Sequence, residues 1–378
     1  MEDWKNGRKG RKGWNGDTPK DFMNRISRRK FLQNSAIGGL GFTAFSKFAM
    51  PIVFSSVMDA DAAQGVISKV VYLHDDNLTS GIIPNETLLQ ISIVSCLKKL
   101  TGKSTISEAW QEILPNYKPD QVIGIKVNCI NSSLPSHPQV VSALISSLVD
   151  FGVPENNIVI WDRTNGELSR CGYNLNTGDF GVRCWGTNSG GWGYDKSKPI
   201  KVAGQTRYLS KILTQLCDYL INVPVLKDHS AAGVTLSLKN HYGSVDNPGA
   251  MHGDNCDPFI AELNKAPDIK NKTKLIVLDA LLGIYLGGPG GAPQFKPNIL
   301  AMSYDTVALD WYGLQLINEE RQNRGLGKVT EKARYIQTAA QMGLGTNDKS
   351  QIEFVSAQVT NSVEPTGKLI RTWGGMKR

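Results

Sequence analysis

The chain has 378 residues, of which 40% are hydrophobic and 20% are charged. This balance fits one large or two small globular domains and excludes a disordered or collagen-like chain. Lys and Arg number 42 against 34 acidic residues, a net charge of +8. Such an excess suggests nucleic acid or anionic lipid as a partner, unless the charge is confined to one segment.

The first 62 residues have the features of an export signal. The sequence SRRKFL at residues 27–32 matches the twin-arginine pattern and precedes a weakly apolar run at residues 34–58. Ala60-Asp61-Ala62 supplies a cleavage pattern, so we expect a removed signal at residues 1–62 and a mature domain at residues 63–378. The alternative is a chance arginine pair in a basic tail. The pattern predicts a periplasmic protein that the Tat translocation machinery exports already folded, a route typical of proteins that receive a cofactor before export.

The export segment also accounts for most of the positive charge. Residues 1–62 hold eleven Lys/Arg and six Asp/Glu, a net charge of +5, which leaves +3 for residues 63–378. The nearly balanced mature chain argues against nucleic acid as a partner. Lys47 interrupts the apolar run, and no later segment has eighteen consecutive apolar residues, so we expect no lasting transmembrane anchor.

Six cysteines, at positions 96, 129, 171, 184, 217 and 256, form no C-x-x-C pair. The sequence therefore contains neither an iron–sulfur nor a zinc-ribbon motif. Cys171 and Cys184 are the one near pair that could form a disulfide after export, and the sequence leaves their pairing open.

From residue 66 onward, β-branched runs alternate with amphipathic stretches. This pattern predicts an α/β fold with a doubly wound, mainly parallel sheet flanked by helices. A strand at residues 121–128, a helix that opens at Pro138, and a strand at residues 157–162 form a β-α-β unit. Gly152 and Pro154 end its helix.

A Gly-rich stretch at about residues 166–206 follows this unit and predicts a loop insertion, either a plain surface loop or a lid. We expect further strands at residues 219–223, 274–278 and 352–359, and helices at residues 306–320 and 332–342.

Polar residues that close the predicted strands are the candidates for a site, because open parallel sheets bind ligands outside the carboxyl ends of their strands. If the strands are parallel neighbours, these side chains converge on one crevice. The candidates are Lys126 and Asn128 with His137 at the next helix start, then Asp162, then Lys227, Asp228 and His229, and finally Asp279.

The third strand ending is the richest, because two lysines, two histidines and a threonine follow within fifteen residues. Lysines hold phosphate or carboxylate as point charges, and a histidine beside them can ligate a metal or carry protons. We therefore predict a site for an anionic small molecule or a metal-containing cofactor, with His229 as acid/base. Lys227 and Lys239 would hold the anion. Further predicted binding residues are Lys126, Asn128, His137, Thr235 and Asn240, and Asp279 is a predicted catalytic residue beside His229 and Lys239.

A metal is one alternative at this site, with His241 and His252 as its candidate ligands. His229, His241 and His252 are twelve and eleven residues apart, unlike the i, i+4 spacing of a helical metal site. His137 could instead be a neighbour of a helix cap, and Lys239 a solvated helix end.

Two further features have competing interpretations. The GGPGG stretch at residues 287–291 has the composition of a phosphate-binding loop but lacks the P-loop spacing, which favours a turn. Asp310 falls on the apolar face of its predicted helix, where a structural hydrogen bond and a catalytic role are both open.

Several stretches resemble domain-of-unknown-function family 362 over most of residues 120–315. They are IGIKVNC with HPQVVSALISSL, then LINVPVLKDHSAAGVTLSLKNHYG, then LDALLGIYLGGPGG with NILAMSYDTVALD. The resemblance implies the fold and the place of a site, but the family's activity is largely unassigned. Members often carry a ferredoxin-like iron–sulfur segment, which this sequence lacks, so an electron-transfer role does not carry over.

The stretch from His229 through AAGVTLSLK to Lys239 is also similar to the nickel-pincer lactate racemase family, in which a histidine precedes the lysine that carries the cofactor. This resemblance implies proton transfer by His229, a cofactor or anion anchor at Lys239, and His252 or His241 as a metal ligand. We expect either an exported enzyme, racemase-like or oxidoreductase in type, or a non-catalytic periplasmic binding or cofactor-maturation protein. The second function would use residues 187–195 as its contact surface.

Overall fold

The computed structural model describes residues 68–359, so the twin-arginine and cleavage patterns lie outside the described residues. The chain divides between residues 63 and 64 into two units, and every described residue belongs to the second. No helix in this part of the chain has the length and apolar character needed to cross a membrane.

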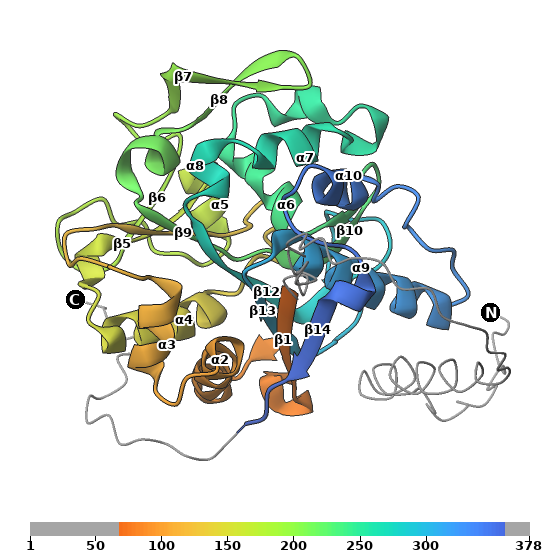
Figure 1. The fold of residues 1–378 in the computed structure, drawn as a ribbon, viewed down its shortest axis with the longest axis horizontal. Helices are drawn as coiled ribbons and strands as arrows, with labels where there is room; N and C mark the ends of the chain where they lie inside the picture. Colours follow the sequence, from red (N-terminus) through yellow and green to blue (C-terminus); the bar gives the residue numbers. More distant parts are fainter. Residues whose placement is uncertain (1–67, 360–378) are drawn as a thin grey trace, which may run out of the picture. The chain divides into compact units, whose positions relative to one another are not determined.

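A ten-stranded sheet forms the centre of the fold (Figure 1). Its strands are β1 (Ser68–His74), β4 (Ile123–Lys126), β5 (Ile158–Asp162), β6 (Arg183–Gly186), β9 (Tyr219–Asn222), β10 (Val225–His229), β11 (Gly233–Thr235), β12 (Thr273–Ile284), β13 (Ile299–Ser303) and β14 (Ile352–Ser356). The order along the sheet is β14-β1-β13-β12-β9-β4-β5-β6, and β10 pairs with both β12 and β11.

Helices pack on the sheet, and single-turn helices and two hairpins connect its strands. The helices are α2 (Glu86–Thr101), α3 (Ile106–Ile113), α4 (Pro138–Phe151), α5 (Asn165–Arg170), α6 (Ser237–Asn240), α7 (Phe259–Asn264), α8 (Pro267–Lys270), α9 (Thr306–Asn323) and α10 (Tyr335–Gln341). The short turns are η1 (Asp76–Leu78), η2 (Glu155–Asn157), η3 (Ile212–Leu216), η4 (His241–Ser244), η5 (Pro248–Met251), η6 (Asp254–Cys256) and η7 (Lys349–Gln351). The hairpins are β2 (Thr79–Ser80) with β3 (Ile83–Pro84), and β7 (Tyr194–Val202) with β8 (Gln205–Ser210).

The strand order confirms the predicted fold class. Strands β6, β5, β4, β9 and β12 lie side by side in this order, and each adjacent pair among them is parallel. The chain builds β4, β5 and β6 outward on one side, and then returns to place β9 and β12 on the other side of β4, which is the doubly wound arrangement. At the opposite end, β13 runs antiparallel to both β12 and β1.

Both faces of the sheet are covered, as alternate residues of β1 show. Val71 and Leu73 belong to the core that α2, α3 and α4 also line. Tyr72, between them, points to the other face and stacks on Tyr312 of α9, with ring centroids 5.8 Å apart. Because each strand is buried on two sides, its sequence is a continuous apolar run, and this is why such runs predicted a parallel sheet.

The elements predicted from the sequence are present with modest boundary changes. Helix α4 begins at Pro138 after the N-cap His137, and ends at Gly152, whose φ of 109° suits a residue without a Cβ. Strand β12 continues to Ile284, six residues past its predicted end. Its extension is fixed by Gly283, where a Cβ would lie 2.2 Å from the Phe295 ring that packs there.

The Gly-rich stretch at residues 166–206 departs from the loop insertion that its composition predicts. It contributes β6, which pairs in parallel with β5 at the edge of the central sheet, and most of the β7–β8 hairpin. Cys184 and Trp185 of β6 are buried, and Trp185 packs on Trp192 with ring centroids 5.3 Å apart. Buried side chains therefore hold this stretch on the sheet, and its glycines are not confined to loops, since Gly186 lies within β6.

Candidate functional site

The strand order reverses between β4 and β9, which are parallel neighbours. Open α/β sheets bind ligands at such a reversal, because the connections leave the strand ends in opposite directions and open a crevice. Lys126 and Asn222 are direct partners at the carboxyl ends of these two strands. Their side chains therefore lie on the same face of the sheet.

A buried ion pair lies at this reversal. Lys126 Nζ is 2.6 Å from Asp162 Oδ1 and donates to the carbonyl of Val127 at 2.7 Å. Asp162 Oδ2 accepts from the backbone N–H of Cys129 at 2.7 Å. The Lys126 ammonium also lies 5.6 Å from the centre of the Trp161 ring. Both charges thus have the partners that burial requires.

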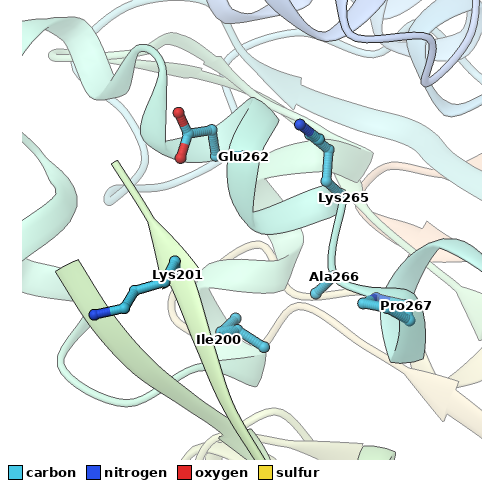
Figure 2. A pocket seen from close by; sticks show the side chains of 6 residues that line it. All are labelled: Ile200, Lys201, Glu262, Lys265, Ala266 and Pro267. Atoms are coloured by element: carbon cyan, nitrogen blue, oxygen red, sulfur yellow. The ribbon is translucent and has the colours of Figure 1, made fainter. Parts of the chain in front are cut away.

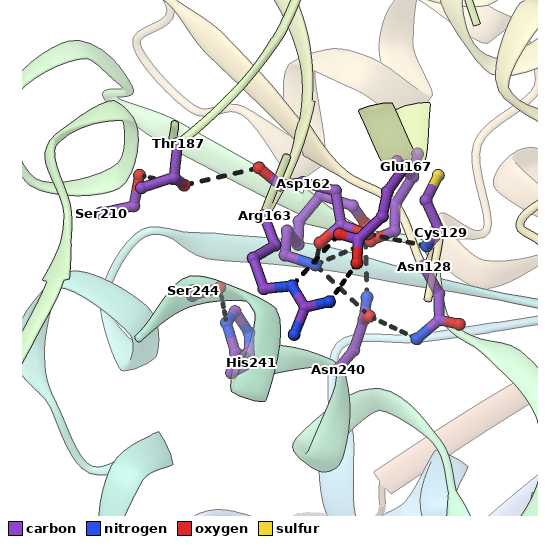
Figure 3. Close-up of polar contacts among 12 residues, drawn as sticks. Asn128, Cys129, Asp162, Arg163, Glu167, Thr187, Ser210, Asn240, His241 and Ser244 are labelled. Atoms are coloured by element: carbon purple, nitrogen blue, oxygen red, sulfur yellow. Dashed lines mark hydrogen bonds and ion pairs between the residues drawn. The ribbon is translucent and has the colours of Figure 1, made fainter. Parts of the chain in front are cut away.

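Amide side chains continue the hydrogen-bonding from this pair. Asn240 Oδ1 accepts from Asn128 Nδ2 at 3.0 Å (Figure 3). Asn240 Nδ2 donates to Asn222 Oδ1 at 2.7 Å. Lys227 Nζ donates to Asn128 Oδ1 at 2.6 Å and to a backbone carbonyl at 3.1 Å. Burial lowers the pKa of Lys227 to about 8. We call these six residues the strand-edge network: Lys126, Asn128, Asp162, Asn222, Lys227 and Asn240.

The convergence predicted from the strand ends therefore holds for Lys126, Asn128, Asp162 and Lys227 but not for the other strand-end residues, and the protein itself fills the crevice. Asn240 lies between the ends of β4 and β9, and the turn that follows covers the ion pair. At Gly243 a Cβ would lie 2.5 Å from Asp162 Oδ1 and 2.7 Å from Lys126 Nζ, so only glycine fits without displacing them. The strand-edge network consequently holds α6 and η4 on the sheet.

A second group of polar side chains surrounds Lys239. Its Nζ is 3.3 Å from His252 Nε2 and 3.9 Å from the centre of the Tyr242 ring. The His252 ring stacks on His229 at 5.6 Å and meets Tyr242 edge-on at 5.2 Å. We call Lys239, His229, Tyr242 and His252 the Lys239 cluster. Lys239 and His229 are 6% and 7% exposed, while His252 reaches the surface.

The Lys239 cluster concentrates basic groups without a compensating acid. Within residues 68–359, Lys239 forms no ion pair with a carboxylate. Burial lowers its pKa to about 8. Burial and then the Lys239 charge lower the pKa of His229 to about 3, and the same two causes lower the pKa of His252. A bound anion would relieve this mutual repulsion.

Hydrogen bonds fix the protonation of both imidazoles. His229 Nδ1 accepts from two following backbone N–H groups, each at 3.1 Å, so neutral His229 carries its proton on Nε2. His252 Nδ1 lies 3.0 Å from the Pro248 carbonyl and donates to it, which leaves the Nε2 lone pair facing Lys239. Neutral His229 is therefore a hydrogen-bond donor through Nε2, and its acid/base role stays a prediction. His252 holds the free basic nitrogen.

A family model described as Domain of unknown function (DUF362) matches residues 123–315. The chain belongs to the DUF362 family. The matched residues contain both the strand-edge network and the Lys239 cluster. No curated protein is significantly similar to this DUF362 chain.

One solved structure with detectable similarity is the crystal structure of a Thermotoga maritima protein from a structural genomics programme. It is 12% identical, with a TM-score of 0.31. The match covers 62% of the DUF362 chain and 58% of the Thermotoga maritima protein.

In the DUF362 chain, the predicted residues His137 and Asp279 form a pair of their own. Asp279 Oδ2 lies 2.7 Å from His137 Nδ1 and accepts from the His137 backbone N–H at 2.8 Å. Burial opposes protonation of His137, but the charge and hydrogen bond of Asp279 outweigh it and raise the pKa of His137. The pair anchors the start of α4 to β12. Asp279 thus lies in a pair with His137 and not in the Lys239 cluster.

The two candidate metal ligands belong to different clusters. His241 is buried under the strand-edge network, with Nδ1 3.1 Å from Ser244 Oγ (Figure 3), and burial and then the Lys126 charge lower its pKa to about 3. His252 faces the Lys239 ammonium, which repels a metal cation. Among residues 68–359, no three His, Cys, Asp or Glu side chains are arranged to hold a metal. These residues do not fit the metal site that the sequence predicts.

Thr235 lies between the two groups. It is the direct partner of Lys227 in the β10–β11 hairpin, so both side chains lie on one face of the hairpin, together with His229 two residues further on. Its Oγ1 is buried, and in the described part of the chain it has no hydrogen-bond partner. Thr235 is therefore a buried polar group with unused hydrogen-bonding capacity beside the proposed site.

Two other candidate segments have structural roles. Asp228 Oδ1 and Oδ2 accept from the backbone N–H groups of Gly288 and Gly287 at 2.7 and 3.1 Å. The N–H groups of Gly287 and Gly288 are thus not free to bind phosphate. This supports the interpretation of the GGPGG stretch as a turn and not as a phosphate-binding loop. Asp310 Oδ1 accepts from the backbone N–H of Ser237 at 2.7 Å at the start of α6, and burial raises the pKa of Asp310 to about 7.

Sequence reasoning did not include several residues among the site candidates. Nothing in the sequence distinguishes Asn222 from other strand residues, because its role depends on pairing with Lys126. Tyr242 differs from other aromatic residues only in that it follows His241. Gly243 carries no chemistry, and its importance comes from contact with a distant ion pair. The adjacency of Tyr242 to the Lys-Asn-His run was the one available signal.

A pocket of about 270 Å³ lies elsewhere, between β7 and the turn from α7 to α8 (Figure 2). None of the predicted site residues lines it, and Glu262 on its wall accepts a hydrogen bond from the backbone N–H of Ala203. The lining residues are Ile200, Lys201, Glu262, Lys265, Ala266 and Pro267.

Proposed function

We propose that this protein binds an anionic small molecule, a phosphate or carboxylate, at the Lys239 cluster. The observation that carries the proposal is a buried amine beside the His252 imidazole, without a carboxylate partner among residues 68–359. Burying an unpaired ammonium is unfavourable, so a structure that retains one needs a counter-charge from another source. A bound anion supplies that charge.

Each member of the cluster has a distinct part in this binding. The Lys239 ammonium provides the charge, and the Nε2–H of His229 provides a directional hydrogen bond. The Thr235 hydroxyl, which has no partner in the described part of the chain, adds a second neutral donor. The strand-edge network fixes Asn240 and so holds the adjacent Lys239 in place.

We further propose that the protein is an enzyme, in which the Lys239–His252 pair takes a proton from the bound anion and returns it during the reaction. His252 presents a neutral nitrogen lone pair 3.3 Å from the Lys239 amine. The alternative is a non-catalytic periplasmic binding or cofactor-maturation protein, which the occupied Nδ1 of His229 favours. Replacing His252 with Gln distinguishes them: an enzyme loses turnover, whereas in a binding protein no reaction depends on this base.

Export through the twin-arginine pathway is the second part of the proposal. Its support is the SRRKFL sequence at residues 27–32 and the A-x-A pattern at residues 60–62. Replacing Arg28 and Arg29 with Lys should leave the protein in the cytoplasm with residues 1–62 attached. Periplasmic accumulation of this double variant would contradict export by that route.

Calorimetry with inorganic phosphate, sulfate and small mono- and dicarboxylates tests the binding function. We expect at least one of these anions to bind, and Lys239→Met to abolish the binding. Lys265→Met is the matched control, because it removes an exposed lysine from another surface. Unchanged binding by Lys239→Met, or no binding of any of these anions by the natural protein, would overturn the proposal.

A further inference from the structure

Cys129 and Cys171 lie together beside the strand-edge network, although 42 positions separate them in the chain. Cys129 follows β4, and Cys171 caps the end of α5. Cys171 Sγ donates to the Cys129 carbonyl oxygen at 3.5 Å, and the two thiols are near enough to shift each other's pKa. Both side chains are buried. The sequence offered Cys184 as the neighbour of Cys171, but Cys184 lies within β6, and both are free thiols.

The two thiols have unequal surroundings. The hydrogen bond from Cys129 lowers the pKa of Cys171, burial opposes this, and the charges of Lys227 and Arg170 assist it. Burial and then the same hydrogen bond raise the pKa of Cys129. An attacking thiol needs thiolate character, whereas a resolving thiol needs only to lie within reach. Cys171 has the first property and Cys129 the second.

We propose that Cys129 and Cys171 form a redox-active dithiol that a peroxide oxidises to an intramolecular disulfide. The Cys171 thiolate attacks one peroxide oxygen, the O–O bond breaks, and the departing oxygen takes a proton to leave as water or an alcohol. The resulting Cys171 sulfenic acid is then attacked by Cys129 sulfur. An S–S bond forms, and the sulfenic oxygen leaves as water with the Cys129 proton. The two thiols together supply the two electrons that reduce the peroxide.

The position of the pair links its oxidation to the network. The backbone N–H of Cys129 donates to Asp162, the carboxylate that pairs with Lys126. A disulfide at this point ties the end of β4 to the end of α5. The disulfide does not involve Lys239, so its formation does not depend on anion binding at the Lys239 cluster.

Thiol titration of the full chain under denaturing conditions, before and after hydrogen peroxide, tests the proposal. The six thiols should fall by two, and peptide mapping should find Cys129 joined to Cys171. Cys184→Ser is the matched control, since it should also lose two thiols. In Cys129→Ser, Cys171 should stop at the sulfenic acid and give a dimedone adduct that the natural protein lacks.

Three results would overturn the dithiol: a natural protein that keeps all six thiols, a disulfide that joins other cysteines, or Cys129→Ser without a Cys171 adduct. If Cys129→Ser does not fold, Cys171→Ser gives an equivalent test. Its remaining thiols should survive peroxide, because Cys129 stays protonated and has no partner to resolve. A loss of two thiols in folded Cys171→Ser would equally contradict the assignment.

Discussion

The strand-edge network and the Lys239 cluster both bury lysines beside histidines, but they differ in whether the buried charge has a carboxylate partner. Each buries a lysine whose pKa burial lowers to about 8, and each lies next to a histidine held neutral. In the network, the Lys126 charge meets Asp162, and three asparagines share donors and acceptors. In the cluster, Lys239 lies near an imidazole, an aromatic ring and the Cys256 thiol, and no carboxylate among residues 68–359 pairs with it.

The difference shows that position at a strand end does not by itself make a binding site. A buried polar group that is already satisfied loses its existing partners when it binds a ligand, whereas an unsatisfied group gains one. The network therefore stabilises the fold at the point where related sheets bind ligands, and we propose that the anion binds at the neighbouring Lys239 cluster instead.

The largest predicted effect concerns the network. Asp162→Ala leaves the buried Lys126 ammonium without its carboxylate and should lower the free energy of unfolding by about 3–5 kcal/mol. Urea denaturation measures the loss. Glu320→Ala is the matched control, because its pair with Arg324 is partly exposed on α9 and should cost roughly 0.5 kcal/mol. Equal stability of Asp162→Ala and the natural protein would show that the network is not structural.

Acid should destabilise the fold through its neutral histidines. His229 and His241 have pKa values of about 3 when folded, below the value of about 6.5 expected when unfolded. As the pH falls below 6.5, both histidines bind protons in the unfolded state but stay neutral in the folded state. Each residue therefore costs about 1.4 kcal/mol of stability per pH unit.

Unfolding measurements at pH 7, 6 and 5 check this sign. His241→Gln should flatten the acid loss. His137→Gln should steepen it, because His137 has a raised pKa and its pair with Asp279 contributes stability that is present below pH 6.5 and lost as the pH rises. Parallel pH profiles for the two variants would contradict the assigned protonation states.

The smallest predicted effect is on Thr235. Thr235→Val replaces a buried hydroxyl that has no partner in the described part of the chain, so the free energy of unfolding should stay the same or rise by up to about 1 kcal/mol. Anion affinity should nevertheless fall severalfold, while Thr235→Ser retains it. A clear loss of stability in Thr235→Val would mean that the hydroxyl has a structural partner and belongs with the network.

The sequence predicted the layout of the sheet well, because buried parallel strands and the caps of α4 depend on local patterns. It also predicted that Lys126, Asn128 and Asp162 meet, since strand ends share an edge. It could not show that Asn240 fills the crevice between them, because that depends on the path of the chain after β11. The Gly-rich stretch misled for a similar reason, as Cys184 and Trp185 become buried only through pairing with β5.

Calorimetry of anion binding across pH 7–9 tests the central claim most directly. Lys239 is partly deprotonated near pH 8 in the free protein, and a bound anion raises its pKa. The natural protein should therefore take up protons on binding, and its affinity should fall as the pH rises above about 8. Lys239→Met should bind at least tenfold more weakly and take up none. Proton uptake and affinity that Lys239→Met leaves unchanged would contradict the account.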